Sequence, residues 1–306
     1  MKIPSLGILP VTDAAPQTVD YIGICEASAA IALDETHFVV ASDETNTFQL
    51  YRRGIARPIR PIKFKKFIGH ERSDIEAAAR IGDRVYWMSS FSRPGEDGNA
   101  RDRSVLVASR IVHTADGPTL KESGTPFVKL RRYLKRELQI DGTDINVEGL
   151  AGSPEGDLLI GFRGPLKDGK AYVLRLKNPI GVTELGRQPV FGDLHLLDLE
   201  NRGVRSIDWT GLSPAVYLVL AGPSPNGDDE EDETAEKGEF SLYSWTGDAQ
   251  KPIRRPLELP EDFTAEALVP YPERGVVQIL SDDKGRKKEP DIPKKKRRFR
   301  SVDVTY

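Results

Sequence analysis

The sequence has a single cysteine, Cys25, so it cannot form an intrachain disulfide bond. Its four histidines are scattered and offer no His and Cys cluster of the kind that holds zinc. No apolar run approaches the roughly 20 residues that a membrane-spanning helix needs. The short apolar run near the start is broken by Pro4 and Pro10 and shows no secretory signal pattern. We therefore expect a cytoplasmic protein with no membrane partner.

Catalytic signatures are also missing. The sequence contains no phosphate-binding loop, no dinucleotide-binding glycine fingerprint, no Gly-x-Ser-x-Gly elbow and no His-Glu-x-x-His pair. With 44 basic and 47 acidic residues among 306, the formal net charge is −3, so no overall field draws the protein to nucleic acid. We expect no nucleic-acid partner, and these features leave open whether the protein is an enzyme.

The sequence does contain a unit that returns five times: an acid, small residues, a turn, and a run rich in β-branched residues. The acids that begin these units are 50, 72, 60 and 58 residues apart, and joining the two ends of the chain leaves 66 residues for the last interval. Units of this size use the whole chain. The five acids are Glu26, Glu76, Glu148, Asp208 and Glu266.

Each unit predicts four strands. After the first two strands come short alternating runs such as NTFQLYRR and KAYVLRLK, and four of the units add a weaker fourth run. The fifth unit lacks a fourth run, and residues 2–11 could supply it. We therefore predict an all-β fold, a single β-propeller over residues 1–306 with five four-stranded blades and an N-terminal strand closing the last blade. A six-bladed propeller and a two-sheet β-sandwich are the alternatives.

Three segments stand outside the repeat. Residues 127–139, FVKLRRYLKRELQ, space their apolar side chains as a helix does, which predicts a short helical insertion between the second and third blades. Residues 225–238 form an acidic loop, and residues 284–298 form a basic loop. Both follow the second strand of a blade, and we interpret them as solvated loops of opposite charge rather than as nucleic-acid patches.

Propeller geometry predicts where the acids lie. The first strand of each blade lines the axis, and its start lies at the same end as the finish of the second strand. The five acids should therefore form a ring at the mouth of a central channel. The repulsion between crowded carboxylates is relieved by protonation, by pairing with bases or by capture of a cation. Oxygen ligands suit Ca²⁺ or Mg²⁺. We predict a metal site formed by Glu26, Glu76, Glu148, Asp208 and Glu266.

The ends of the second strands should add another ring at the same mouth. From the two rings we predict a ligand-binding site in which Arg163 meets Glu148. Gly161 and Gly164 flank Arg163, which favours the close approach of another group to the backbone, with a tight turn as the alternative. The second ring consists of Asp43, Ser90, Arg163, Gly222 and Asp282, of which all but Gly222 are candidate ligand-binding residues.

Some of these acids also fit a purely structural role. Glu76, Asp208 and Glu266 could accept backbone hydrogen bonds or pair with an arginine such as Arg205. Asp282 could belong to a turn before Gly285. Both interpretations remain open from the sequence.

Several stretches, in order along nearly the whole chain, resemble a mainly bacterial family of propeller-like proteins, domain of unknown function number 3616. The resemblance implies a propeller and brings no activity. Relatives often carry Ser-His where this sequence has Ser90-Phe91, so it implies no catalytic histidine there. The stretches are CEASAAIAL with VVASDETNTFQLY, SDIEAAARIGDRVYWMSSFSR, INVEGLA with LLIGFRGPL, RGVRSIDW with YLVLAGPS, FSLYSWTG and ILSDDKG.

The motif EGLA, residues 148–151, is similar to one in esterase-like phytases and in calcium-dependent lactonase-type propellers. That similarity implies a metal-holding role for Glu148. Together these features predict a protein that binds a small anionic ligand or a divalent cation at an acidic channel mouth. The alternatives are a metal-dependent phosphoesterase or esterase-like hydrolase, in which Arg163 binds the anionic group, and a scaffold for protein–protein interaction. The expected partner is a small molecule or a peptide.

Overall fold

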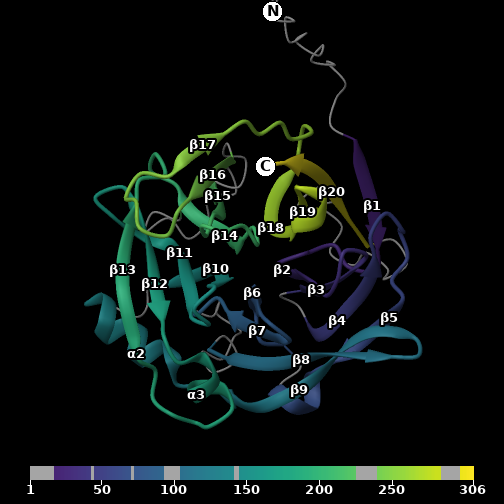
Figure 1. Ribbon diagram of the computed structural model, residues 1–306, viewed down its shortest axis with the longest axis horizontal. Coiled ribbons are helices and arrows are strands. Elements are labelled where there is room, and N and C mark those ends of the chain that lie inside the picture. Colours follow the sequence, from purple (N-terminus) through teal and green to yellow (C-terminus); the bar gives the residue numbers. More distant parts are fainter. Residues whose placement is uncertain are drawn as a thin grey trace, which may run out of the picture.

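The computed structural model describes residues 17–42, 45–69, 72–92, 104–140, 145–224, 240–283 and 297–306. Their strands form five four-stranded antiparallel sheets, arranged as blades around a common axis (Figure 1). The innermost strands β2, β6, β10, β14 and β18 face the centre of the ring. The predicted five-bladed β-propeller is therefore confirmed, and the six-bladed propeller and the β-sandwich are excluded.

Within each blade the strands follow one another outward from the axis. The first blade contains β2 (Ala29–Ala32), β3 (His37–Ser42), β4 (Thr45–Arg52) and β5 (Arg60–Lys63). The second contains β6 (Ile75–Ile81), β7 (Arg84–Ser89), β8 (Leu106–Thr114) and β9 (Gly117–Phe127). The third contains β10 (Asn146–Gly152), β11 (Leu158–Lys167), β12 (Lys170–Leu176) and β13 (Phe191–Leu197).

The fourth and fifth blades follow the same plan. The fourth contains β14 (Gly203–Trp209), β15 (Tyr217–Gly222), β16 (Ser241–Trp245) and β17 (Ile253–Arg255). The fifth contains β18 (Thr264–Tyr271), β19 (Val276–Asp282), β20 (Arg298–Thr305) and β1 (Thr18–Ile22). Short helices lie between strands: α1 (Lys65–Ile68), α2 (Leu130–Leu138), α3 (Pro179–Thr183) and the 3₁₀ turn η3 (Pro272–Arg274).

Both faces of each blade are buried against a neighbouring blade. Five hydrophobic clusters result, one at each junction. Strand β7 shows how one strand serves two of them, because successive side chains point to opposite faces. Val85 and Trp87 pack toward the first blade, and Tyr86 and Met88 pack toward the third. This two-sided burial explains why the strand sequences are apolar in near-continuous runs rather than in strict alternation.

An N-terminal strand closes the ring, as predicted. Strand β1 pairs antiparallel with β20, with Tyr21 opposite Phe299, so the fifth blade combines residues from both ends of the sequence. The closing strand is Thr18–Ile22 rather than residues 2–11, which lie outside the described residues. Stacked and edge-to-face rings of Tyr21, Phe38 and Phe299 then pack across the seam between the fifth and first blades.

Helix α2 begins at Leu130, inside the segment predicted to be helical. Its four buried side chains are Leu130, Tyr133, Leu134 and Leu138, the residues whose spacing indicated a helix, and three of them join the cluster between the second and third blades. The acidic loop, residues 225–238, lies outside the described residues. Residues 284–296 of the basic loop also lie outside them. Within the described ranges, no helix is both long enough and apolar enough to cross a membrane.

Candidate binding site on the propeller axis

Four of the five innermost strands carry a β-bulge near their starting end. In each of them the pairing with the second strand shifts by one residue, and the extra residue is charged. A bulge leaves one residue outside the regular ladder and re-aims its side chain. The extra residues are Glu76 in β6, Glu148 in β10, Arg205 in β14 and Glu266 in β18. The bulges therefore bring four charged side chains to the same level, at the end where the inner strands begin.

Ion pairs connect three of the blades at this level. Arg163, from β11, donates from Nη1 to Oε1 of Glu148 at 3.0 Å. Arg205 donates from Nη1 to Oε2 of Glu148 at 2.9 Å, and from Nη2 to Oε1 of Glu266. The carboxylate of Glu148 is thus held between two guanidinium groups. This confirms the predicted meeting of Glu148 and Arg163 across the two rings.

Several charged groups act electrostatically on Arg205 or on Glu266, and we call this set, together with those two residues, the axial charge cluster. It consists of Glu76, Glu148, Arg163, Arg205, Glu266 and Asp282. The side chains at its centre are shielded from water: Arg205 is 5% exposed, Glu148 8%, Glu266 12% and Arg163 18%. In such surroundings charges interact more strongly than they do on a surface.

Burial shifts the protonation of the cluster. Burial raises the pKa of Glu266, the carboxylates Glu148 and Asp282 add to this rise, and Arg205 and Arg163 oppose it; the resulting pKa is about 8. Burial alone would lower the pKa of Arg205, but Glu148, Glu266 and other nearby carboxylates raise it above its ordinary value. Arg205 therefore stays charged, and Glu266 is the member of the pair that titrates near neutral pH.

Asp208 does not belong to this group. In β14 it lies opposite Leu218, near the finish of the strand, whereas Gly203 at the start lies opposite Gly222. Burial raises the pKa of Asp208 well above its ordinary value, although the backbone N–H of Trp209, at 2.8 Å, and the charge of Arg80 oppose the shift. The predicted placement of Asp208 in the ring is wrong, because Arg205 is the bulged residue of β14.

Three other predicted residues, Glu26, Ser90 and Asp282, lie at the same end of the propeller. Glu26, which is 2% exposed, comes before β2 and forms an isolated antiparallel bridge with Asp282, the last residue of β19. Ser90 lies just after β7. Its hydroxyl group donates to Asp74, and its carbonyl oxygen accepts the backbone N–H of Val147 at 2.7 Å. Asp43 lies outside the described residues.

The glycines around Arg163 have a packing role. A Cβ atom on Gly161 would lie 2.7 Å from Cγ1 of Val204, and one on Gly149 would lie equally close to the same atom. A Cβ atom on Gly203 would lie 2.0 Å from the carbonyl oxygen of Arg163. The group that approaches the backbone here is therefore the neighbouring fourth blade, so these glycines are explained without a ligand.

Among the described residues, no three His, Cys, Asp or Glu side chains gather in the way a metal ion requires. Both oxygens of Glu148 bind arginines, and one oxygen of Glu266 binds Arg205. A guanidinium group supplies positive charge where the sequence predicted Ca²⁺ or Mg²⁺. Metal binding by Glu26, Glu76, Glu148 and Glu266 stays a prediction.

Sequence reasoning missed Arg205 because it aligned the repeats by their acids. In RGVRSIDW the acid, Asp208, comes three residues after the position that matches Glu148. The signal that could have corrected the alignment is the pair of small residues Gly149 and Ser206, each of which follows the bulged residue. The other three bulged residues are glutamates, so Arg205 is also the base that a ring of crowded carboxylates needs.

Fold and site together define a five-bladed β-propeller with a buried charge cluster on its axis. The chain belongs to the family described as "Protein of unknown function (DUF3616)", whose model matches residues 96–271, more than half of the sequence. A comparison with curated proteins finds no match.

Comparison with solved structures finds similar chains at low sequence identity. The glutaminyl cyclase of Myxococcus xanthus is 10% identical, with a TM-score of 0.50 over 96% of this chain and 97% of that one. The Cps50 (Swd1) propeller domain of Myceliophteria thermophila is 10% identical, with a TM-score of 0.41 over 94% and 100%. Hydrazine synthase of Kuenenia stuttgartiensis is 10% identical, with a TM-score of 0.40 over 95% and 85%. These likenesses concern the fold alone.

Proposed function

We propose that this protein binds a small ligand through a positively charged ammonium group, at the axial charge cluster. The observation that carries this proposal is the state of Glu266. Its Oε1 atom accepts from Arg205, whereas its Oε2 atom accepts no hydrogen bond from any described residue. The side chain is 12% exposed, so Oε2 is an acceptor in largely desolvated surroundings. An ammonium group hydrogen-bonds such an oxygen with a charge-assisted bond.

The balance of charge supports a cation rather than an anion. In the described part of the chain the axial charge cluster has four carboxylates and two guanidinium groups, a formal excess of two negative charges when all are ionised. Both arginines are already engaged: Arg163 donates to Glu148 and, from Nε, to the carbonyl oxygen of Pro223 at 3.0 Å. An anionic ligand would have to displace Glu148 from between the two arginines.

An ammonium group suits the cluster better than a bare metal ion. Ca²⁺ and Mg²⁺ require several oxygens that converge on one point, and the carboxylates of this cluster are drawn toward Arg163 and Arg205 instead. An ammonium group needs only single acceptors in separate directions. We therefore propose binding of an ammonium group, rather than metal-dependent hydrolysis, as the function.

Thermal unfolding with a panel of amines tests the proposal. At pH 8.5 the panel contains ethylamine and spermidine, each compared with an uncharged analogue such as acetamide. A binding amine at ten times its dissociation constant should raise the melting temperature by about 2–4 °C. The rise should be lost in Glu266→Gln and kept in Glu261→Gln, which changes an exposed glutamate. Equal responses to charged and uncharged compounds would contradict the proposal.

Location and other partners stay predictions. The single cysteine, Cys25, is buried and unbridged, which suits the reducing conditions of the cytoplasm. A role as a scaffold for protein partners would depend on surfaces outside the axial charge cluster.

A further inference from the structure

The ion pairs of the axial charge cluster form an open chain rather than a closed ring. Arg163 and Arg205, from the third and fourth blades, both pair with Glu148. Arg205 also pairs with Glu266 of the fifth blade. Guanidinium and carboxylate groups therefore alternate across three adjacent blades, whose inner strands β10, β14 and β18 follow one another around the axis (Figure 1). A guanidinium group ends this chain on one side, and a carboxylate ends it on the other.

The Arg163 end of the chain keeps one donor group without a partner. Nε of Arg163 donates to the carbonyl oxygen of Pro223 at 3.0 Å, and Nη1 donates to Glu148, also at 3.0 Å. In the described part of the chain no residue accepts from Nη2, and this atom is not fully buried, so it is open to solvent. Because the guanidinium group is planar and two of its nitrogens are held, the direction of Nη2 is fixed.

The Glu266 end of the chain keeps one acceptor without a partner. Oε1 accepts from Arg205, whereas Oε2 accepts from no described residue and is likewise not fully buried. The charge of Arg163 acts electrostatically on Glu266, so the two ends of the chain are near neighbours at the same mouth. One open donor and one open acceptor in a partly desolvated place are the complement of a ligand that brings an acceptor and a donor.

The charge at the mouth decides which kind of acceptor Nη2 of Arg163 suits. Glu148 already lies 3.0 Å from Nη1 of the same guanidinium group, and the carboxylates of the axial charge cluster outnumber its guanidinium groups by four to two among the residues described. A carboxylate on the ligand would be repelled by Glu148 at short range. A neutral carbonyl oxygen accepts the same hydrogen bond and adds no negative charge.

We propose that the ligand of the axial charge cluster is an amino amide, a compound that combines an ammonium group with a neutral amide carbonyl. Its ammonium group donates to Oε2 of Glu266, and its carbonyl oxygen accepts from Nη2 of Arg163. Bound in this way, it links the third blade to the fifth and closes the chain of ion pairs. This inference rests on the function proposed above, and it specifies the second half of the ligand.

Calorimetric titration at pH 8.5 with compounds of matched chain length tests this inference. At this pH most of Glu266 is ionised, and alkylamines keep their proton. The series 4-aminobutanamide, 5-aminopentanamide and 6-aminohexanamide varies the distance between the two groups of the ligand. The best of them should bind at least about tenfold more tightly than the alkylamine of the same chain length, which lacks the carbonyl group. It should also bind more tightly than the matching amino acid, in which a carboxylate replaces the amide.

One substitution isolates the carbonyl contact. Arg163→Met removes the Nη2 donor and leaves Arg205 paired with both Glu148 and Glu266. In this variant the amino amide should lose its advantage and bind about as tightly as the matched alkylamine. The ratio is measured within one folded protein, so a general loss of stability does not change it. In Arg255→Met, at an exposed position, the tenfold preference should remain.

The outcomes separate this inference from the proposed function. Equal binding of the amino amide and the alkylamine by the wild-type protein overturns the inference and leaves ammonium binding in place. Binding of the matching amino acid as tight as that of the amino amide, or a preference that persists in Arg163→Met, has the same consequence. If no charged amine binds, or if the uncharged alkyl amide without an ammonium group binds equally well, both the inference and the proposed function are overturned.

Discussion

Arg205 of the fourth blade donates from Nη1 to Oε2 of Glu148 in the third blade, at 2.9 Å, and both side chains are less than a tenth exposed. The same guanidinium group also reaches Glu266 in the fifth blade. Hydrophobic clusters hold each blade to the next through apolar contacts that have no preferred direction. The buried ion pairs add directional contacts at the axis, so they fix how the three blades meet.

Removing Arg205 should destabilise the fold strongly. In Arg205→Met the side chain keeps much of its volume, but Glu148 and Glu266 lose their shared partner while they remain buried. We expect the free energy of unfolding to fall by about 3–5 kcal/mol, the usual cost of breaking a buried pair on one side. Urea unfolding followed by tryptophan fluorescence measures this change.

The matched control is Arg255→Met, at an exposed arginine of β17. Its effect should stay within about 0.5 kcal/mol. A loss in Arg205→Met no larger than in this control would show that the ion pairs contribute nothing to the way the blades meet.

Close packing at Gly161 predicts a second effect. In Gly161→Ala the new methyl group would lie 2.7 Å from Cγ1 of Val204, so the third and fourth blades must move apart. We expect a loss of about 1–3 kcal/mol in the free energy of unfolding, as overpacked cores show. Val204→Ala removes the opposing methyl group, so the double variant should recover part of the loss. Strictly additive effects in this double-mutant cycle would contradict the packing explanation.

These two predictions also show what could be learned from the sequence. The five returns of the acid and the strand runs were enough to predict the blades, because a closed ring is the arrangement that leaves no open sheet edge. The meeting of Glu148 and Arg163 followed from antiparallel pairing alone, since both lie at the same end of one hairpin.

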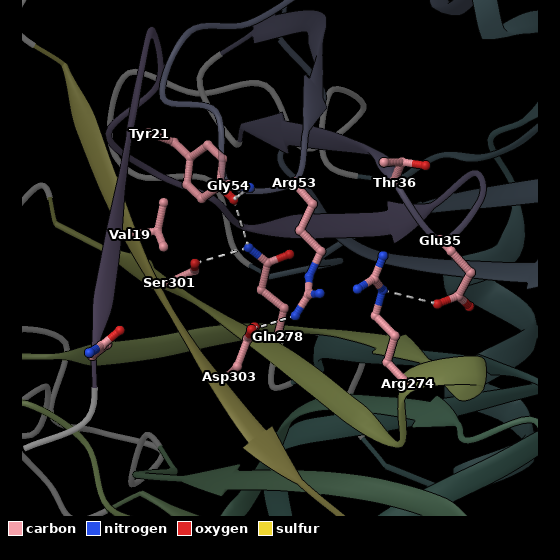
Figure 2. A pocket seen from close by; sticks show the side chains of 11 residues that line it. Val19, Tyr21, Glu35, Thr36, Arg53, Gly54, Arg274, Gln278, Ser301 and Asp303 are labelled. Carbon is pink, nitrogen blue, oxygen red and sulfur yellow. Dashed lines mark hydrogen bonds and ion pairs between the residues drawn. The ribbon is translucent and has the colours of Figure 1, made fainter. Parts of the chain in front are cut away.

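Other features depend on contacts that no local pattern carries. A β-bulge shifts the register by one residue, and this shift places Arg205 rather than Asp208 beside Glu148. Position 161 holds a glycine because Val204, in the next blade, packs closely against it. A cavity at the seam between the fifth and first blades is lined by residues from both ends of the chain, Tyr21 and Ser301 among them (Figure 2). No local sequence motif could therefore predict it.

Stability should depend on pH through Glu266. Burial raises its pKa from an ordinary value near 4.5 to about 8, so the folded protein binds a proton that the unfolded chain has released between these values. This contribution is fully present below about pH 4.5 and is lost as the pH rises through 8. The slope approaches about 1.4 kcal/mol per pH unit.

The difference between the wild-type protein and Glu266→Gln isolates this contribution, because other titrating groups cancel. Unfolding free energies measured from pH 5 to 9 should fall with pH in the wild-type protein more steeply than in the variant. Parallel curves would show that Glu266 titrates at its ordinary value.

Proton release on ligand binding is the most direct test of the proposed axial site. An ammonium group should bind the ionised form of Glu266, so binding at pH 7 should expel the proton that this side chain holds. Calorimetry of one amine in phosphate and in Tris, two buffers with different ionisation enthalpies, gives the number of protons released. With a pKa of about 8 for Glu266, we predict about nine-tenths of a proton per ligand at pH 7 and about a tenth at pH 9. Binding without proton release at pH 7, or the same release in Glu266→Gln, would contradict the account.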